Sequence, residues 1–197
     1  MLSNQKAMEI AINLKDKYKL GLCKRKYGTI SWYLNNFQDA INSYKESLQI
    51  FEELDSLQQV ATTLSNLGTA YYAKGEYNFA VDYFLRAYDL IDTVLYRREA
   101  SDYLNDIGAI YNEWGNRAKA LEYYLHSYRM NQAIDNKRGM ATNLDNIGNI
   151  YVQNEEFQKA LPFLYQGLSI EKLIGNKYGE GYSLLSIGSV YNEINQF

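Results

Sequence analysis

The chain has 197 residues, of which 47% are hydrophobic, enough to bury a sizeable core. Twenty Lys and Arg against 23 Asp and Glu give a formal net charge of −3, which offers no reason to expect binding to nucleic acid or to anionic lipid. The lone Cys23 excludes an intrachain disulfide, and with the lone His126 it cannot form a zinc cluster. No stretch reaches the roughly 18 apolar residues of a membrane span and the polar start is no signal peptide, so a cytoplasmic setting is expected.

Glycine recurs at intervals of 40 residues along the whole chain. The five positions are Gly28, Gly68, Gly108, Gly148 and Gly188. Around Gly108, as around the three other later glycines, apolar residues stand four and one residues before it and tyrosine stands three residues after it, here Leu104, Ile107 and Tyr111. Steps of three and four residues place all of them on one face of a helix. Glycine on that face predicts the close approach of a second helix, which outweighs a helix-propensity cost of about 1 kcal/mol.

A second helix follows in each period. Twelve residues after each of the first four glycines comes a small residue, and a large one follows four positions later. These small residues are Ala40, Ala80, Ala120 and Ala160. Asn, Asp and Gly at 35–36, 75, 115 and 154–155 predict the turn inside each pair of helices, and the same residue types at 55–56, 135–136 and 175–176 predict the break between pairs. The unit is therefore predicted to be a helical hairpin.

In chain order, the sequence predicts one array of such hairpins over residues 1–197. Residues 1–20 match only the second helix of a preceding unit, residues 21–60, 61–100, 101–140 and 141–180 are full units, and residues 181–197 match only a first helix. Phe197 is predicted to fall in the turn. Without a following helix, Leu184, Ile187 and Tyr191 should be exposed, which led us to expect that the chain is part of a longer protein.

The spacing of Leu, Ile, Gly, Tyr and then Ala resembles the tetratricopeptide repeat over almost the whole chain. Its usual period is 34 residues, whereas 40 is similar to the longer variety of kinesin light chains, spindle-orientation scaffolds and bacterial signalling proteins. The resemblance implies an all-α, right-handed α-α superhelix whose first helices line a concave surface. It also implies a non-catalytic protein that binds a peptide or another protein.

No constellation for catalysis stands out in the sequence. The glycines are too far apart for a phosphate loop, and neither Cys23 nor His126 has a partner residue nearby in the sequence. We therefore expect no enzyme activity, no catalytic residue, no metal and no cofactor. Most of the 20 tyrosines fall in core columns rather than among basic residues, so they do not indicate stacking on single-stranded RNA.

The remaining face of the first helices is polar and rich in asparagine, whose amide donates and accepts at once and so suits an extended peptide backbone. The formal charge of this face runs +2, 0, −3, −1, −1 from the first to the fifth repeat. Its predicted binding residues are Arg25, Lys26, Asn66, Asp102, Asn105, Asp106, Asn112, Glu113, Asp145, Asn146, Asn149 and Asn192. In related long-repeat scaffolds the asparagine two residues before the glycine holds the peptide main chain, and Asn66 and Asn146 match that column.

The acidic middle of this face predicts a protein or peptide ligand with basic side chains or a free amine, since Asp102 and Asp106 would repel a C-terminal carboxylate. One alternative is a self-association spacer whose exposed end helices stack between copies. Another is an input domain of a sensor kinase, cyclase or transcription regulator whose activity lies outside this segment, which is an analogy from the repeat style alone.

Overall fold

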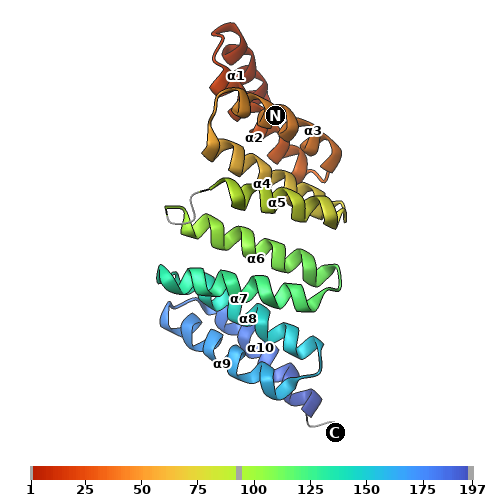
Figure 1. Ribbon diagram of the computed structural model, residues 1–197, viewed down its shortest axis with the longest axis vertical. Coiled ribbons are helices and arrows are strands. Elements are labelled where there is room, and N and C mark those ends of the chain that lie inside the picture. The colour runs from red at the N-terminus through yellow and green to blue at the C-terminus, as the bar shows by residue number, and fades with distance from the viewer. Residues whose placement is uncertain (1, 92–94, 195–197) are drawn as a thin grey trace. The chain divides into compact units, whose positions relative to one another are not determined.

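The computed structural model describes residues 2–91 and 95–194, and within these ranges every regular element is a helix (Figure 1). This confirms the predicted all-α class of sequential helical hairpins. The helices fall into two compact units, Met1–Asp92 and Thr93–Phe197. The single array predicted over residues 1–197 and its division into repeats stay predictions, and the turn predicted at Phe197 lies outside the described residues.

The first unit contains five helices, and each packs against the next along the chain. They are α1 (Leu2–Asn13), α2 (Lys17–Tyr33), α3 (Phe37–Glu53), α4 (Leu57–Ala73) and α5 (Tyr77–Leu90). The second unit contains α6 (Arg97–Glu113), α7 (Arg117–Ala133), α8 (Lys137–Gln153), α9 (Phe157–Leu173) and α10 (Lys177–Ile194). Here too each helix packs against its successor, and α8 also contacts both α6 and α10.

Short turns with one left-handed residue join the helices. The backbone φ angle is positive at Asn35, Gly75, Gly115 and Glu155 inside the hairpins, and at Lys15, Asp55, Asp135 and Gly175 between them. Gly, Asn and Asp tolerate this conformation best, which explains why they occupy most of these positions. All of the turns predicted from Asn, Asp and Gly contain such a residue.

The recurring glycines lie where the second helix of each hairpin crosses the first. A Cβ atom placed on Gly108 would come within 2.7 Å of the ring of Tyr124, and one placed on Gly68 within 2.6 Å of the ring of Phe84. Gly28 faces Tyr44 and Gly148 faces Leu164 in the same way. The large residue on each second helix therefore packs directly onto the glycine backbone of the first helix.

Helix α10 presents the same face, and no described helix packs onto its Gly188. No described atom lies within 4 Å of the position that a Cβ on Gly188 would take. Leu184 is 51% exposed and Tyr191 is 43% exposed, as predicted. The prediction for Ile187 was wrong, because this residue is only 6% exposed: it packs with Leu164, Leu168 and Val190 against the preceding helix. None of the described helices is long and apolar enough to cross a membrane.

Candidate functional site

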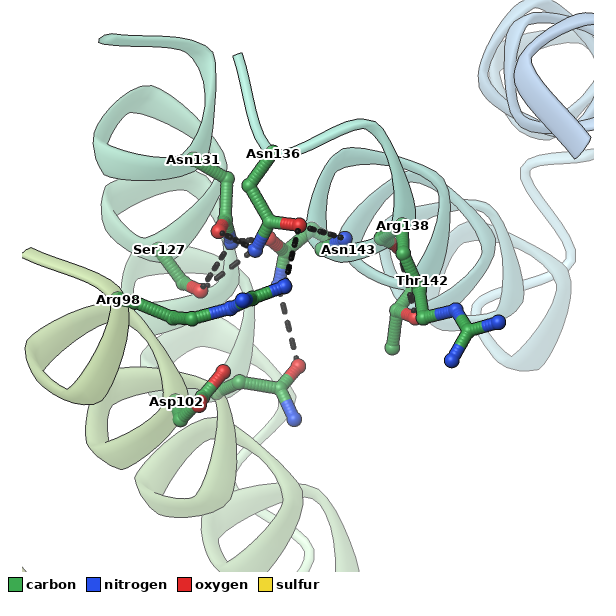
Figure 2. A pocket seen from close by; sticks show the side chains of 10 residues that line it. Arg98, Asp102, Ser127, Asn131, Asn136, Arg138, Thr142 and Asn143 are labelled. Carbon is green, nitrogen blue, oxygen red and sulfur yellow. Dashed lines mark hydrogen bonds between the residues drawn. The ribbon is translucent and has the colours of Figure 1, made fainter. Parts of the chain in front are cut away.

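A pocket of about 270 Å³ lies in the second unit where the first halves of α6 and α8 meet the last turns of α7 (Figure 2). Its rim carries Arg98 and Asp102 from α6 and Arg138 and Thr142 from α8. Its other lining residues are Asn105, Ser127, Asn131, Asn136, Gly139 and Asn143. Ser127, Asn131 and Asn143 are almost completely buried, so the pocket has a polar floor built from two first helices and the second helix between them.

The floor is a chain of hydrogen bonds between asparagine side-chain amides, and it begins at a backbone N–H group. The amide N–H of Gly139 donates to Asn136 Oδ1 at 3.3 Å, which is the N-cap contact of α8. Asn136 Nδ2 donates to Asn131 Oδ1 at 2.7 Å, and Asn131 Nδ2 donates to Asn143 Oδ1 at 2.9 Å. Asn143 Nδ2 then donates to Asn105 Oδ1 at 3.0 Å. The chain thus connects the start of α8 through α7 to the exposed side of α6.

Every amide oxygen in this network lies near a second donor group. Asn105 Oδ1 also accepts from Asn146 Nδ2 at 3.1 Å, and Asn143 Oδ1 lies 3.2 Å from the hydroxyl of Ser127. Asn131 Oδ1 also lies 3.0 Å from the hydroxyl of Ser101, and Asn136 Oδ1 lies 3.4 Å from the guanidinium of Arg98. A carbonyl oxygen has two acceptor positions, so Asn105 Oδ1 is saturated by its two amide donors. The hydroxyls of Ser127 and Ser101 have one hydrogen each and also lie 2.7 Å from the backbone oxygens of Ser101 and Arg98.

Two carboxyl groups lie beside this chain on α6. Burial, reinforced by the negative charge of Asp102 and opposed by a hydrogen bond from Asn105, raises the pKa of Asp106 to about 7. Burial also raises the pKa of Asp102, while the positive charge of Arg98 opposes that rise. The pair therefore holds a reduced negative charge at neutral pH when no ligand is present, and a nearby cation would favour ionisation of both groups.

A second acidic pair is buried between α8, α9 and α10. Asp145 is 5% exposed and accepts hydrogen bonds from the hydroxyl of Ser183, with its two oxygens at 3.0 and 3.2 Å. Burial and then the charge of Glu171 raise the pKa of Asp145 to about 6, against the effect of the Ser183 hydroxyl. Glu171 is equally buried, and its Oε2 atom has no hydrogen-bond partner among the described residues. Its carboxylate lies directly against Gly179 of α10.

Comparison with known proteins relates part of the chain to one family. Residues 59–133 match the tetratricopeptide repeat family. The match spans α4 to α7, so these helices form tetratricopeptide repeats. No curated protein sequence matches it. Tetratricopeptide repeats in general bind proteins or peptides, and their scaffold is usually non-catalytic.

Solved structures with the same fold include three tetratricopeptide-like neighbours of low sequence identity. BtubC (BKLC) from P. vanneervenii is 17% identical with a TM-score of 0.84, and the match covers 100% of this chain and 83% of that one. Aspartyl phosphate phosphatase F from Bacillus subtilis is 16% identical with a TM-score of 0.85, covering 98% of this chain and 52% of that one. MamA is 23% identical with a TM-score of 0.63, covering 87% and 86%. These similarities establish the fold of the repeat and nothing about its ligand.

The structure brings several predicted binding residues of the second unit together. Asn105 and Asn146 are joined by a hydrogen bond, and Asp102 and Asp106 flank them on α6. Asn149 Nδ2 donates to the hydroxyl of Tyr182 on α10 at 3.0 Å. We call the surface formed by Asp102, Asn105, Asp106, Asn146 and Asn149 the α6–α8 face.

Other predicted binding residues of the tetratricopeptide repeats lie elsewhere. Asp145 is turned into the buried contact with α10 and is not part of the α6–α8 face. Asn112 is half-buried with an Oδ1 atom that has no partner among the described residues, while Glu113 and Asn192 are exposed on α6 and α10. In the first unit, Lys26 is exposed and Asn66 is half-buried. Arg25 is half-buried above the ring of Phe51, and burial lowers its pKa.

Three residues of the site were missed by reasoning from the sequence, namely Asn131, Asn136 and Asn143. Asn136 was assigned to a turn, and Asn131 and Asn143 lie outside the columns assigned to the peptide-binding face. A signal was present, since asparagine is a poor residue for a helix interior.

Within residues 2–91 and 95–194, no group of three or more His, Cys, Asp or Glu side chains could hold a metal ion.

Proposed function

We propose that this tetratricopeptide-repeat protein is a non-catalytic, cytoplasmic binding protein that holds an extended protein segment against the α6–α8 face. The observation that carries the proposal is the pair of hydrogen-bonded amides, Asn105 and Asn146, at the open end of the buried asparagine chain. Amides held in place by the protein lose little entropy on binding, and they match the alternating donors and acceptors of a peptide backbone.

The charge of the face supports a ligand with a basic side chain or a free amine. Asp102 and Asp106 lie one helical turn apart on α6, and each has a raised pKa because the site is partly shielded from water. An ammonium or guanidinium group placed between them would draw both carboxyls into the ionised form. In such a site the attraction is stronger than at an open surface.

Selection of short random peptides against the purified protein tests the proposal. We expect the selected peptides to contain Lys or Arg and to bind with an affinity that the double charge reversal Asp102→Lys and Asp106→Lys lowers by roughly tenfold or more. Glu122→Lys, a single charge reversal at an exposed position of α7, is the control and should leave the affinity unchanged. Selected peptides that bind both variants equally would show that the α6–α8 face is not the binding surface.

The exposed face of α10 favours a second candidate function, self-association. Leu184, Leu185 and Tyr191 are exposed large side chains on one helix, and Gly188 leaves a notch that is filled in the other hairpins. A contact between copies through α10 would bury this surface. Sedimentation of the protein over a range of concentrations tests this function, and a monomer at all concentrations would exclude it.

A further inference from the structure

The hydrogen bonds between the buried asparagine amides can be donated in only one direction. An amide oxygen accepts and an amide nitrogen donates, so the group that each amide faces decides its orientation. The backbone N–H of Gly139 is a donor only, and it therefore fixes the oxygen of Asn136 toward itself. Each following amide is fixed in turn, through Asn131 and Asn143 to Asn105.

A second backbone group fixes the middle of the chain independently. The hydroxyl of Ser127 lies 2.7 Å from the carbonyl oxygen of Ser101, where it must donate. The same hydroxyl oxygen is then an acceptor for Asn131 Nδ2 at 3.4 Å. Both backbone contacts require the same orientation of Asn131, and this residue is only 2% exposed, so water cannot substitute for its partners.

The orientation of the chain determines what the protein offers to a ligand. Asn105 uses its oxygen for Asn143 and Asn146 and one N–H for Asp106, so its second N–H is left to donate. Asn146 uses its nitrogen for Asn105, so its oxygen is left to accept. The open end of the chain therefore presents a donor from α6 next to an acceptor from α8.

We propose that Asn131, acting through Asn143 and Asn105, is a positioning residue that sets the direction of the bound segment. In an extended chain, the N–H and the C=O of one residue point to the same side, and the N–H comes first along the chain. When the N–H meets the oxygen of Asn146 and the C=O meets the NH2 of Asn105, the segment runs from α8 toward α6. This inference rests on the proposed function, since it concerns the same α6–α8 face.

The first test needs no ligand. In the free protein, Asn131→Asp replaces the donating NH2 by an acceptor, so Asn143 must turn its NH2 toward residue 131 and Asn105 must turn in response. We expect the side-chain NH2 resonances of Asn105 and Asn146 to shift in nuclear magnetic resonance spectra. Asn78→Asp, which adds the same charge at an exposed position of α5, is the control. Unchanged Asn105 resonances in a folded variant would overturn the relay.

A buried carboxylate can unfold a domain, and Asn143→Ser therefore serves as a second variant. Ser183 occupies the position 40 residues later, so serine is compatible with this site in the fold. The substitution cuts the chain between Asn131 and Asn105 without adding charge. We expect the Asn105 resonances to shift and the affinity for a selected peptide to fall by roughly tenfold, the effect of losing about one hydrogen bond. A folded Asn143→Ser protein with unchanged resonances and unchanged affinity would refute the positioning role.

The direction of the segment is tested with a peptide selected on the α6–α8 face and spin-labelled at either end. A label at the N-terminus should broaden backbone resonances of α10, which lies beside α8, and a label at the C-terminus should broaden those of α6. The opposite pattern would overturn the inferred direction while leaving peptide binding intact. If no peptide can be selected, the proposed function fails, and the free-protein spectra still decide whether the relay exists.

Discussion

The same substitution, glycine to alanine, should stabilise the protein at Gly188 but not at Gly108, the equivalent position of another helix in the same unit. At Gly108 the new methyl group would come within 2.7 Å of the Tyr124 ring, which is buried, so the ring or one of the two helices must move. At Gly188 no described atom lies within 4 Å of the methyl position. Both residues lie inside helices of similar local sequence, in α6 and α10.

The sizes of the two effects follow from helix propensity and packing. Alanine is favoured over glycine in a helix interior by about 1 kcal/mol, so Gly188→Ala should raise the free energy of unfolding by up to that amount. At Gly108 the same gain is offset by overpacking, which typically costs about 1–3 kcal/mol. Gly108→Ala should therefore range from neutral to about 2 kcal/mol less stable, and the two variants should differ by about 1–3 kcal/mol.

Urea and thermal unfolding of the two variants measure this difference. Both positions lie in the second unit, so hydrogen exchange of its helices can separate the effect from unfolding of the first unit. For a unit of this size, each 1 kcal/mol corresponds to a shift in Tm of about 4–8 °C. If Gly108→Ala stabilises the protein as much as Gly188→Ala does, close packing is not the reason for the repeated glycine.

Three further predictions concern charge and the exposed helix. Because the folded-state pKa of Asp145 is raised to about 6, its ionisation should destabilise the second unit as the pH rises from about 4 to 6, and Asp145→Asn should remove up to about 3 kcal/mol of that loss in urea unfolding. The affinity for a basic peptide should increase from pH 6 to 8, because Asp106, with a pKa of about 7, must ionise; a pH-independent Kd measured by fluorescence anisotropy would argue against its role. Leu184→Lys with Tyr191→Lys should abolish any concentration-dependent sedimentation, since both side chains are exposed on α10.

The fold could be predicted from the sequence because the same residue spacing recurs in every repeat. Each glycine stands at a fixed distance from an alanine and a large residue, so a helical hairpin was the only pattern that fitted all the copies. The helix ends followed from Asn, Asp and Gly in the turns, whose left-handed residues the structure contains. Ile187 was mispredicted because it packs against the preceding helix, α9, which covers it without any following helix.

The site could be predicted only as a set of positions. Asn105 and Asn146 belong to columns that face away from the core, and this follows from helical periodicity alone. The repeat period does not determine the orientation of an amide, which depends on hydrogen bonds between residues 5 to 41 positions apart, such as those that join Asn131 to Asn143 and Asn143 to Asn105. Asp145 was placed on the groove for the same reason, since only the position of Ser183 in space reveals that it faces α10.

In the second unit the helical hairpin recurs, but the polar residues at equivalent positions of the hairpins differ. Forty residues after Asn105 and Asn131, which are neutral, stand Asp145 and Glu171, which are ionisable. The same step replaces Asn143 by Ser183, so the chain of amides ends at α8 and an acidic pair takes its place under α10. Neutral amides keep their hydrogen bonds at every pH, whereas ionisation of Asp145, whose pKa burial raises to about 6, destabilises the contact with α10. The α6–α8 contact should therefore be the more rigid support for a ligand, and the docking of α10 should be the contact that weakens first as the pH rises.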